Sequence, residues 1–233
     1  MSGAAETVDI PGNVARIRDR IARAALRVGR RPEDIRLVAA AKKMEAARVR
    51  LAIAAGVADI GENYVQEAVA KIAGAGAGAR WHLIGHLQRN KAAVAAEIFD
   101  LIQTVDSLQL AEAIGRHALS LGKMMDVLLQ VNTSGEATKS GVEPDELQGL
   151  FERVAVVPGI RVQGLMTIGS MQPDPELGRP EFRLLVDLAR RLERVGAEMK
   201  WLSMGMSHDF EVAIEEGANL VRIGTGVFGP RPG

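Results

Sequence analysis

Short apolar runs recur along the chain, and a longer segment with helical periodicity follows each of them. The runs are nearly continuous rather than alternating, which is typical of strands in a parallel sheet that is covered on its faces. We interpret eight runs as strands: residues 36–41, 58–61, 81–85, 101–105, 127–131, 162–168, 199–203 and 220–223. Regular alternation of strands and helices predicts an α/β fold.

Residues with helix-capping preferences stand at the ends of several predicted helices. Ser107 begins a helix that reaches residue 121, with Gly122 as its stop, and Gly196 ends a helix that begins near residue 180. These are the residue types favoured at helix starts and just beyond helix ends. A further amphipathic helix, over about 13–28, precedes the first strand.

Two α/β architectures fit this alternation, a (β/α)₈ TIM barrel and a doubly wound sheet. We prefer the barrel with an extra N-terminal helix because there are about eight strands and little sequence follows the loop after the last one. Barrels of this kind often use about 200 to 250 residues as a single unit. We therefore expect residues 1–233 to form one domain.

Two loops have features that suggest a functional role. The glycine-alanine run at 74–79 resembles a phosphate loop, but it follows a helix and precedes a strand. Glycine-rich phosphate loops instead follow a strand and open a helix, so we interpret this run as a flexible connection. The segment 172–180 contains three prolines and follows a strand, so it could overhang a site at the barrel mouth.

Composition narrows the possible partners and location. Lys plus Arg equals Asp plus Glu at 29 each, so no overall basic field exists to hold nucleic acid or an anionic membrane. The chain has no cysteine, which excludes disulfides and thiolate chemistry. The first ten residues do not resemble a signal peptide, and no apolar run approaches the roughly 20 residues of a membrane helix. We expect a cytoplasmic protein.

Lys42 directly follows the first apolar run, at the end of the strand where barrel sites are built. A lysine leaving an apolar strand is poorly solvated, which lowers its pKa and frees its amine to attack a carbonyl carbon. A surface lysine that merely begins a loop is the alternative, and the adjacent Lys43 weakens the signal.

The last two predicted strands are followed by loops of small and hydroxyl residues. Residues 203–207, which run from Ser203 to Ser207, follow the seventh strand, and Gly224, Thr225 and Gly226 follow the eighth. Barrels commonly hold phosphate at these two loops through backbone N–H groups. Tight turns without a ligand are the alternative.

Charged and titratable residues inside strands are the remaining candidates. Arg222 lies within the last apolar run, where it should bind a ligand or pair with a carboxylate such as Glu62. His82 and His86 flank a strand, but the residues around them do not have metal-ligand spacing. We expect no metal site.

Several segments in order along the chain resemble the pyridoxal phosphate homeostasis proteins, also called the YggS/PROSC family. They cover nearly the whole chain and are highly specific when taken together. They are 37–42, 61–67 (GENYVQE), 81–85 (WHLIG), 87–91 (LQRNK), 131–132 with 139–141, 164–168 (GLMTI), 202–207 (LSMGMS) and 221–229 (VRIGTGVFG).

This resemblance implies a barrel like the N-terminal domain of alanine racemase, with pyridoxal 5′-phosphate (PLP) bound as a Schiff base on Lys42. It further implies that Asn63 lines the site and that Arg222 faces the pyridine nitrogen. The phosphate would be held by Ser203, Gly224 and Thr225. The family usually reads Ser-Lys-Thr-Lys-Pro at the reactive lysine, whereas residues 41–45 here read AKKME. The extra amine at Lys43 leaves open which lysine reacts.

Three functions fit these features. The first is a non-catalytic protein that stores, buffers or delivers PLP. PLP acts as an electron sink when its ring nitrogen is protonated, and an arginine there cannot accept that proton and disfavours protonation by its fixed charge. The second is a PLP-dependent amino-acid racemase, with the chain's single tyrosine, Tyr64, as the second acid or base. The third is a cofactor-free barrel aldolase or isomerase. We expect a monomer whose partners are PLP and PLP-dependent apoenzymes, with no nucleic acid and no membrane.

Overall fold

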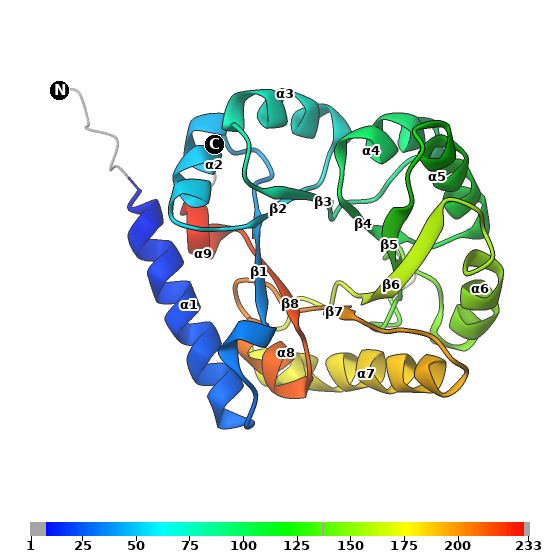
Figure 1. The fold of residues 1–233 in the computed structure, drawn as a ribbon. Coiled ribbons are helices and arrows are strands. Elements are labelled where there is room, and N and C mark those ends of the chain that lie inside the picture. Colours follow the sequence, from blue (N-terminus) through cyan, green and yellow to red (C-terminus); the bar gives the residue numbers. More distant parts are fainter. Residues whose placement is uncertain (1–7, 137, 231–233) are drawn as a thin grey trace.

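The computed structural model describes residues 8–136 and 138–230. Eight parallel strands close into a barrel in sequence order, with the last strand paired to the first (Figure 1). The strands are β1 (Arg36–Ala40), β2 (Asp59–Glu62), β3 (Arg80–Leu83), β4 (Leu101–Val105), β5 (Met125–Gln130), β6 (Ile160–Met166), β7 (Trp201–Ser203) and β8 (Leu220–Ile223). Each overlaps a predicted strand. The TIM-barrel prediction is confirmed, because a doubly wound sheet would have open edges.

Helices surround the barrel on its outside (Figure 1). They are α1 (Ile10–Arg27), α2 (Ala46–Ala54), α3 (Val65–Ala75), α4 (Ala92–Ile98), α5 (Leu108–Ser120), α6 (Leu147–Val154), α7 (Arg179–Arg194), α8 (Phe210–Glu216) and the short α9 (Thr225–Phe228). The prediction that the glycine-alanine run is a loop is wrong in part, because α3 continues into it as far as Ala75 and is capped by Gly76, where φ is +82°. Alanine favours helix strongly enough to extend α3 to that glycine.

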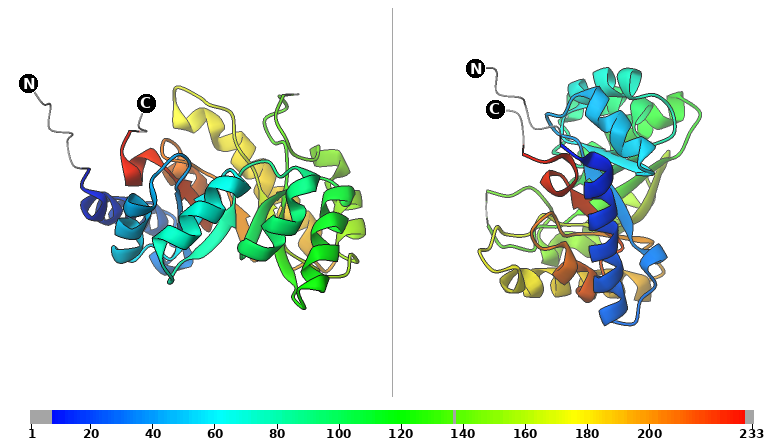
Figure 2. Two further views of the ribbon diagram at one scale, coloured as in Figure 1. Left: turned by 90° about the horizontal axis from the view of Figure 1, so that it is seen from above. Right: turned by 90° about the vertical axis from the view of Figure 1, so that its left-hand side faces the viewer.

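The predicted N-terminal helix is present as α1 and packs across the seam between the first and last strands. It contacts α2, α8 and α9, and the right-hand view of Figure 2 shows α1 in dark blue beside the red α9 and the orange α8. The side-chain amide of Asn13 donates a 2.9 Å hydrogen bond to the carbonyl of Val227. The first and last described helices are therefore joined directly, beside the loop that follows β8.

Two apolar cores hold the fold together. The larger one fills the layer between the strands and the helices, as expected from strands that are apolar on both faces. The smaller one lies inside the barrel and consists of Val38, Leu101, Leu128, Met166 and Leu220. No helix within the described residues is long and apolar enough to cross a membrane.

Close contact between β6 and β7 depends on a glycine. Gly164 has φ +151°, and a Cβ atom there would lie 1.9 Å from the carbonyl oxygen of Trp201. The register between β5 and β6 shifts at this point, where Leu128 pairs with Gly164. A glycine inside a strand often marks such an irregularity or close backbone approach.

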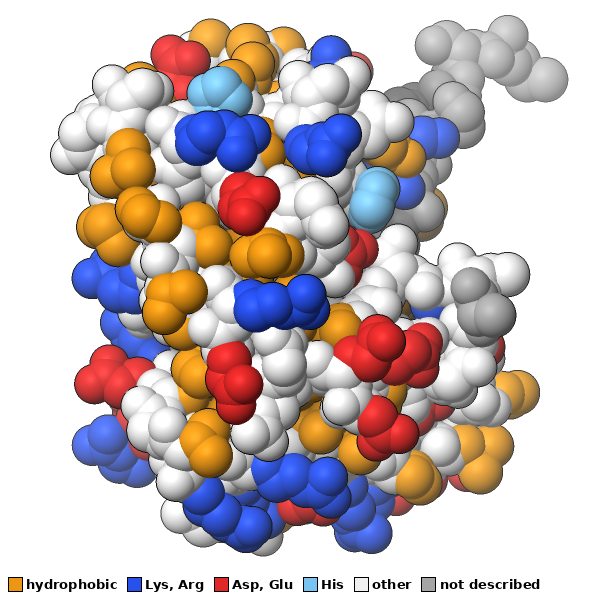
Figure 3. Space-filling view, turned by 90° about the vertical axis from the view of Figure 1, so that its right-hand side faces the viewer, with side chains coloured by type: hydrophobic (Ala, Val, Ile, Leu, Met, Phe, Trp, Pro, Cys, Tyr) orange, Lys and Arg blue, Asp and Glu red, His pale blue; other side chains and the backbone are white. Residues whose placement is uncertain are grey.

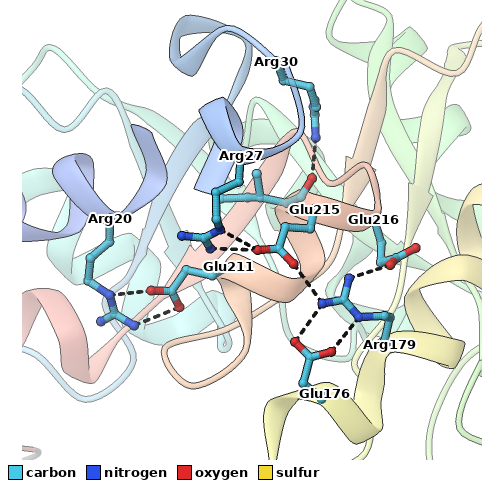
Figure 4. Close-up of polar contacts among 9 residues, drawn as sticks. Arg20, Arg27, Arg30, Glu176, Arg179, Glu211, Glu215 and Glu216 are labelled. Atoms are coloured by element: carbon cyan, nitrogen blue, oxygen red, sulfur yellow. Dashed lines mark hydrogen bonds and ion pairs between the residues drawn. The ribbon is translucent and has the colours of Figure 1, made fainter. Parts of the chain in front are cut away.

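A network of charges joins α1, α7 and α8 on the outside of the barrel (Figure 4). Arg179 at the start of α7 contacts Glu176, Glu215 and Glu216, with nitrogen–oxygen distances of 2.6 to 2.8 Å. Arg27 on α1 reaches Glu215 at 2.8 Å. The hydrogen bonds that Arg179 donates to these glutamates, that to Glu176 foremost, raise the pKa of Arg179.

The charge network should make stability depend on acid pH. Burial alone would raise the pKa values of Glu215 and Glu216, but their arginine partners outweigh it and lower them. A lowered pKa means that the stabilisation is present above the ordinary glutamate pKa and is lost as pH falls through the folded value. We expect Arg179→Met to lower the free energy of unfolding by about 1 kcal/mol at pH 7. Urea unfolding should show this difference shrinking at pH 3, and an equal difference at both pH values would contradict the assignment.

Candidate functional site

The predicted reactive lysine lies at the barrel mouth. Lys42 follows β1 after one intervening residue and is half-buried, at the end of the strands where barrel sites are built. Its Nζ atom lies 5.1 Å from the centre of the Tyr64 ring, which is itself 47% exposed. The amine is therefore next to an aromatic face at an opening to solvent.

The neighbouring Lys43 has a different environment. It is exposed and has φ +61°. Among the residues that the structure describes, Lys43 is the one non-glycine residue with a left-handed backbone. Such a conformation is uncommon for a side chain of this kind and persists only where the surroundings impose it. Its backbone N–H donates a 3.0 Å hydrogen bond to Glu67 on α3. The turn thus separates the two adjacent lysines.

Two charged residues of α3 hold the turn that carries Lys42. Lys71 is buried, and its amine donates 2.7 Å hydrogen bonds to the carbonyl of Ala41 and to Glu62. It donates a third, at 3.0 Å, to the same Glu67 oxygen that binds the backbone of Lys43. We call Glu62, Glu67 and Lys71 the α3 clamp. It fixes the peptide groups on both sides of Lys42.

The two carboxylates of the α3 clamp have pKa values shifted in opposite directions. Burial raises the pKa of Glu62, and this effect exceeds the opposing influence of Lys71. Burial also acts on Glu67, but the Lys43 N–H and Lys71 outweigh it, so the pKa of Glu67 is lowered. One oxygen of Glu62 is buried without a hydrogen-bond partner among the described residues. Lys71 is therefore the group that makes burial of Glu62 tolerable.

Asn63 directly follows β2 and is half-buried beside the Lys42 turn. A glycine allows the next loop to lie against it, because a Cβ atom on Gly85 would be 2.4 Å from the carbonyl oxygen of Asn63. Close backbone approach of this kind is a standard reason for glycine at a site. The loops after β2 and β3 are consequently packed together at the mouth.

The loops after β7 and β8 meet on the other side of Lys42. The backbone N–H of Gly226 points to the hydroxyl of Ser207 at 3.5 Å. Gly224 sits over the end of β1, where an added Cβ atom would lie 3.3 Å from the carbonyl oxygen of Ala40. Thr225 is exposed at this junction. Backbone N–H groups, hydroxyls and the absence of bulky side chains give this place the donor set that a phosphate requires.

Ser203 is placed differently from the other predicted phosphate residues. Its side chain is fully buried, and its hydroxyl donates a 2.6 Å hydrogen bond to Gln103 inside the barrel. The same oxygen accepts a hydrogen bond from Arg222. Ser207, four residues later, is the serine whose hydroxyl lies at the β8 loop.

Arg222 is buried in β8 at 4% exposure and binds neutral acceptors. Its guanidinium donates to the Ser203 hydroxyl and, at 2.6 Å, to the carbonyl of Thr167. Burial lowers the pKa of Arg222 to about 10, so the group stays charged at neutral pH. The alternative pairing with Glu62 is wrong, because that carboxylate binds Lys71.

The two histidines near β3 are far from equivalent. His82 is buried inside the barrel between Asp59 and Gln103, whereas the exposed His86 lies 3.9 Å from an oxygen of Asp106. The residues that the structure describes contain no group of three His, Cys, Asp or Glu side chains placed to hold a metal.

The prolines after β6 lead into a short 3₁₀ turn before α7, and this loop touches the rim of the site. His208, which follows Ser207, donates a 3.2 Å hydrogen bond to the carbonyl of Pro173. The loop therefore borders the β7 loop.

Comparison with known proteins identifies the family. The alanine racemase N-terminal domain profile matches residues 13–232. The chain is 43% identical to the pyridoxal phosphate homeostasis protein of Aquifex aeolicus over 220 residues, covering 94% of this chain and 96% of that protein. The chain belongs to the pyridoxal phosphate homeostasis protein family. The Escherichia coli K12 member is 41% identical over 234 residues, with 96% and 97% coverage.

A solved structure of similar sequence has the same fold. PipY of Synechococcus elongatus PCC7942, in its structure with PLP bound, is 34% identical and superposes with a TM-score of 0.84. The match covers 95% of this chain and all of PipY. The resemblance found in the sequence is thus confirmed at the level of both family and architecture.

Proposed function

We propose that this protein binds PLP and serves in its homeostasis by storing, buffering or delivering the cofactor. The observation that carries the proposal is that Lys42 and the Gly224 loop follow the paired strands β1 and β8, so that an amine and a phosphate-type donor set stand at the same end of the barrel. The names of the relatives and the PLP in the PipY structure support it.

Each site residue then has a role. We propose that the Lys42 amine condenses with the cofactor aldehyde, releasing water to form a Schiff base, while Asn63 lines the ring. Gly224, Thr225 and Ser207 would hold the phosphate through N–H and hydroxyl donors. Both known hydrogen bonds of Ser203 are made inside the barrel, so we assign it to the support of Arg222.

Arg222 is the basis for proposing that the protein does not turn over substrate efficiently. PLP supplies an electron sink when its ring nitrogen is protonated. A guanidinium that stays charged cannot take up that proton, and its fixed charge opposes protonation of a neighbouring nitrogen. We propose that Arg222 faces the ring nitrogen and so weakens the sink.

A racemase is the second candidate, and one contact favours it. Tyr64 is the chain's single tyrosine, and its ring lies 5.1 Å from the Lys42 amine. It could act as a second acid or base, but it is exposed and close to Lys42. Two-base racemisation instead needs its groups on opposite faces of the substrate. We therefore favour the carrier.

An absorbance titration followed by a turnover assay separates the candidates. A saturable absorbance band on adding PLP would support binding, and an unchanged spectrum would favour the cofactor-free aldolase instead. L-alanine should then keep its optical rotation. Multiple turnovers at about 1 s⁻¹ or faster would refute the carrier function.

We further propose PLP-dependent apoenzymes as recipients, a cytoplasmic location, and a single-domain monomer without nucleic-acid or membrane partners. The face around α5 and α6 supports the monomer, since charged side chains of both signs are interspersed with apolar ones there (Figure 3). Stable self-association instead favours an apolar central patch depleted in charge.

A further inference from the structure

A continuous series of buried side chains crosses the barrel interior from the mouth to the opposite end. It runs from Arg222 on β8 through Ser203 on β7, Gln103 on β4 and His82 on β3 to Asp59 on β2. Each of the five is at most 4% exposed. We call this series the interior relay. Most barrels fill this space with branched apolar residues, so five linked polar side chains require an explanation.

The placement of the Gln103 amide atoms gives each hydrogen bond of the interior relay a direction. An arginine can only donate, so Ser203 accepts from Arg222 and its own proton goes to the Gln103 carbonyl oxygen. The Gln103 amide nitrogen must then face His82. His82 Nδ1 therefore accepts, and the imidazole is neutral with its proton on Nε2.

The interior relay ends at the carboxylate of Asp59, which is surrounded by hydrogen-bond donors and cations. Asp59 accepts the Nε2 proton of His82 at 3.0 Å and contacts Arg80 at 2.9 Å. A nitrogen of Arg36 lies 3.9 Å away. Burial raises the pKa of Asp59, but His82 and the two arginines outweigh it, so its pKa is below the usual value. An ionised Asp59 sets the polarity of the whole series.

The mouth end of the interior relay meets the cofactor-binding loops. The backbone N–H of Arg222 donates to the carbonyl of Gly205, and Gly224 lies two residues further along. Two neutral acceptors fix the guanidinium: Ser203, which belongs to the relay, and the carbonyl of Thr167. Without Gln103 to accept its proton, the Ser203 hydroxyl could rotate and point that proton toward Arg222. It would then no longer accept a hydrogen bond from the guanidinium.

We propose that Gln103, His82 and Asp59 are positioning residues that hold the Arg222 guanidinium, through Ser203, in the orientation that meets the cofactor ring. The inference rests on the proposed function, because PLP is the group that Arg222 would meet. It assigns a binding role to residues at the end of the barrel remote from the ligand. A residue that merely filled the interior would affect folding and not the ligand spectrum.

The first test needs no cofactor. In protein carrying ¹⁵N-histidine, the buried His82 should give the signals of a neutral ring protonated on Nε2. Ser203→Ala, at the mouth end, should shift the Nδ1 signal of His82 although the two residues do not touch. A charged ring, a proton on Nδ1, or an Nδ1 signal indifferent to Ser203→Ala would overturn the proposal.

The second test reads the ligand. Gln103→Leu should weaken PLP binding about tenfold, the effect of losing one hydrogen bond to a charged group. It should also move the absorbance maximum of bound PLP. Ser203→Ala gives the same readout with a smaller change of volume should Gln103→Leu not fold.

Leu101→Ala is the matched control. Leu101 lies two residues before Gln103 on β4 and belongs to the apolar core inside the barrel. This variant should lower stability and leave the spectrum of bound PLP unchanged. An unchanged spectrum in Gln103→Leu and Ser203→Ala, or an equal shift in Leu101→Ala, would refute the positioning role. If the parent protein itself gives no band with PLP, the proposed function fails, while the histidine signals still test the interior relay.

Discussion

Lys42→Ala should abolish covalent capture of PLP by this protein. The amine of Lys42 lies at the mouth, 5.1 Å from the centre of the Tyr64 ring, whereas Lys43 is exposed on a left-handed turn. Borohydride reduction after PLP addition should therefore label the peptide that contains Lys42. The saturable absorbance band should disappear in the variant, because no other amine replaces the lost one in the same position.

Lys43→Ala is the control for this result. It removes the competing amine next in sequence, and the Lys43 side chain carries none of the hydrogen bonds of the turn that we describe, which uses the backbone N–H. It should keep the band and the label. Loss of the label in Lys43→Ala with retention in Lys42→Ala would show that the family register is shifted by one residue here.

Lys71→Met should have the largest effect on stability. The methionine nearly keeps the length of the side chain but leaves Glu62 buried without its cation. Removing one partner of a buried ion pair lowers the free energy of unfolding by about 3–5 kcal/mol. Urea unfolding at pH 7 should show a loss of this size. The same variant frees the carbonyl of Ala41, so borohydride trapping at Lys42 should also slow.

A double variant distinguishes charge from packing. Glu62→Gln combined with Lys71→Met removes both charges of the buried pair and should recover much of the lost stability. If the double variant is as unstable as Lys71→Met alone, the uncompensated carboxylate is not the cause. Recovery of stability without recovery of trapping would separate the positioning of Lys42 from the stability of the barrel.

The strands and the mouth position of Lys42 could be predicted from sequence because both depend on local pattern. A continuous apolar run marks a covered strand wherever it lies, and a polar residue at its end reaches the mouth. The same reasoning found the loops that contain Gly224 and Ser207. It could not predict that Ser203 is buried inside the barrel whereas Ser207 lies at the β8 loop, since this depends on where β7 ends and which face of it Ser203 occupies.

The α3 clamp and the interior relay could not be predicted in this way. Glu67 and Lys71 stand four residues apart, a spacing that also occurs in any solvent-exposed helical ion pair. Gln103 and His82 signal buried polarity inside apolar runs, but their partners come from strands distant in sequence. Those contacts exist only after the barrel closes.

That closure has a consequence for the order in which the protein becomes functional. Lys42 leaves the ribosome early, whereas the β8 loop comes near the end of synthesis, and β1 and β8 can pair only then. Contacts so distant in sequence form late because a long loop must be closed first. A nascent or truncated chain thus has the amine without the β8 loop that we propose holds the phosphate. We expect PLP to bind only the closed barrel and to stabilise it by mass action, so the cofactor would also act as a folding ligand.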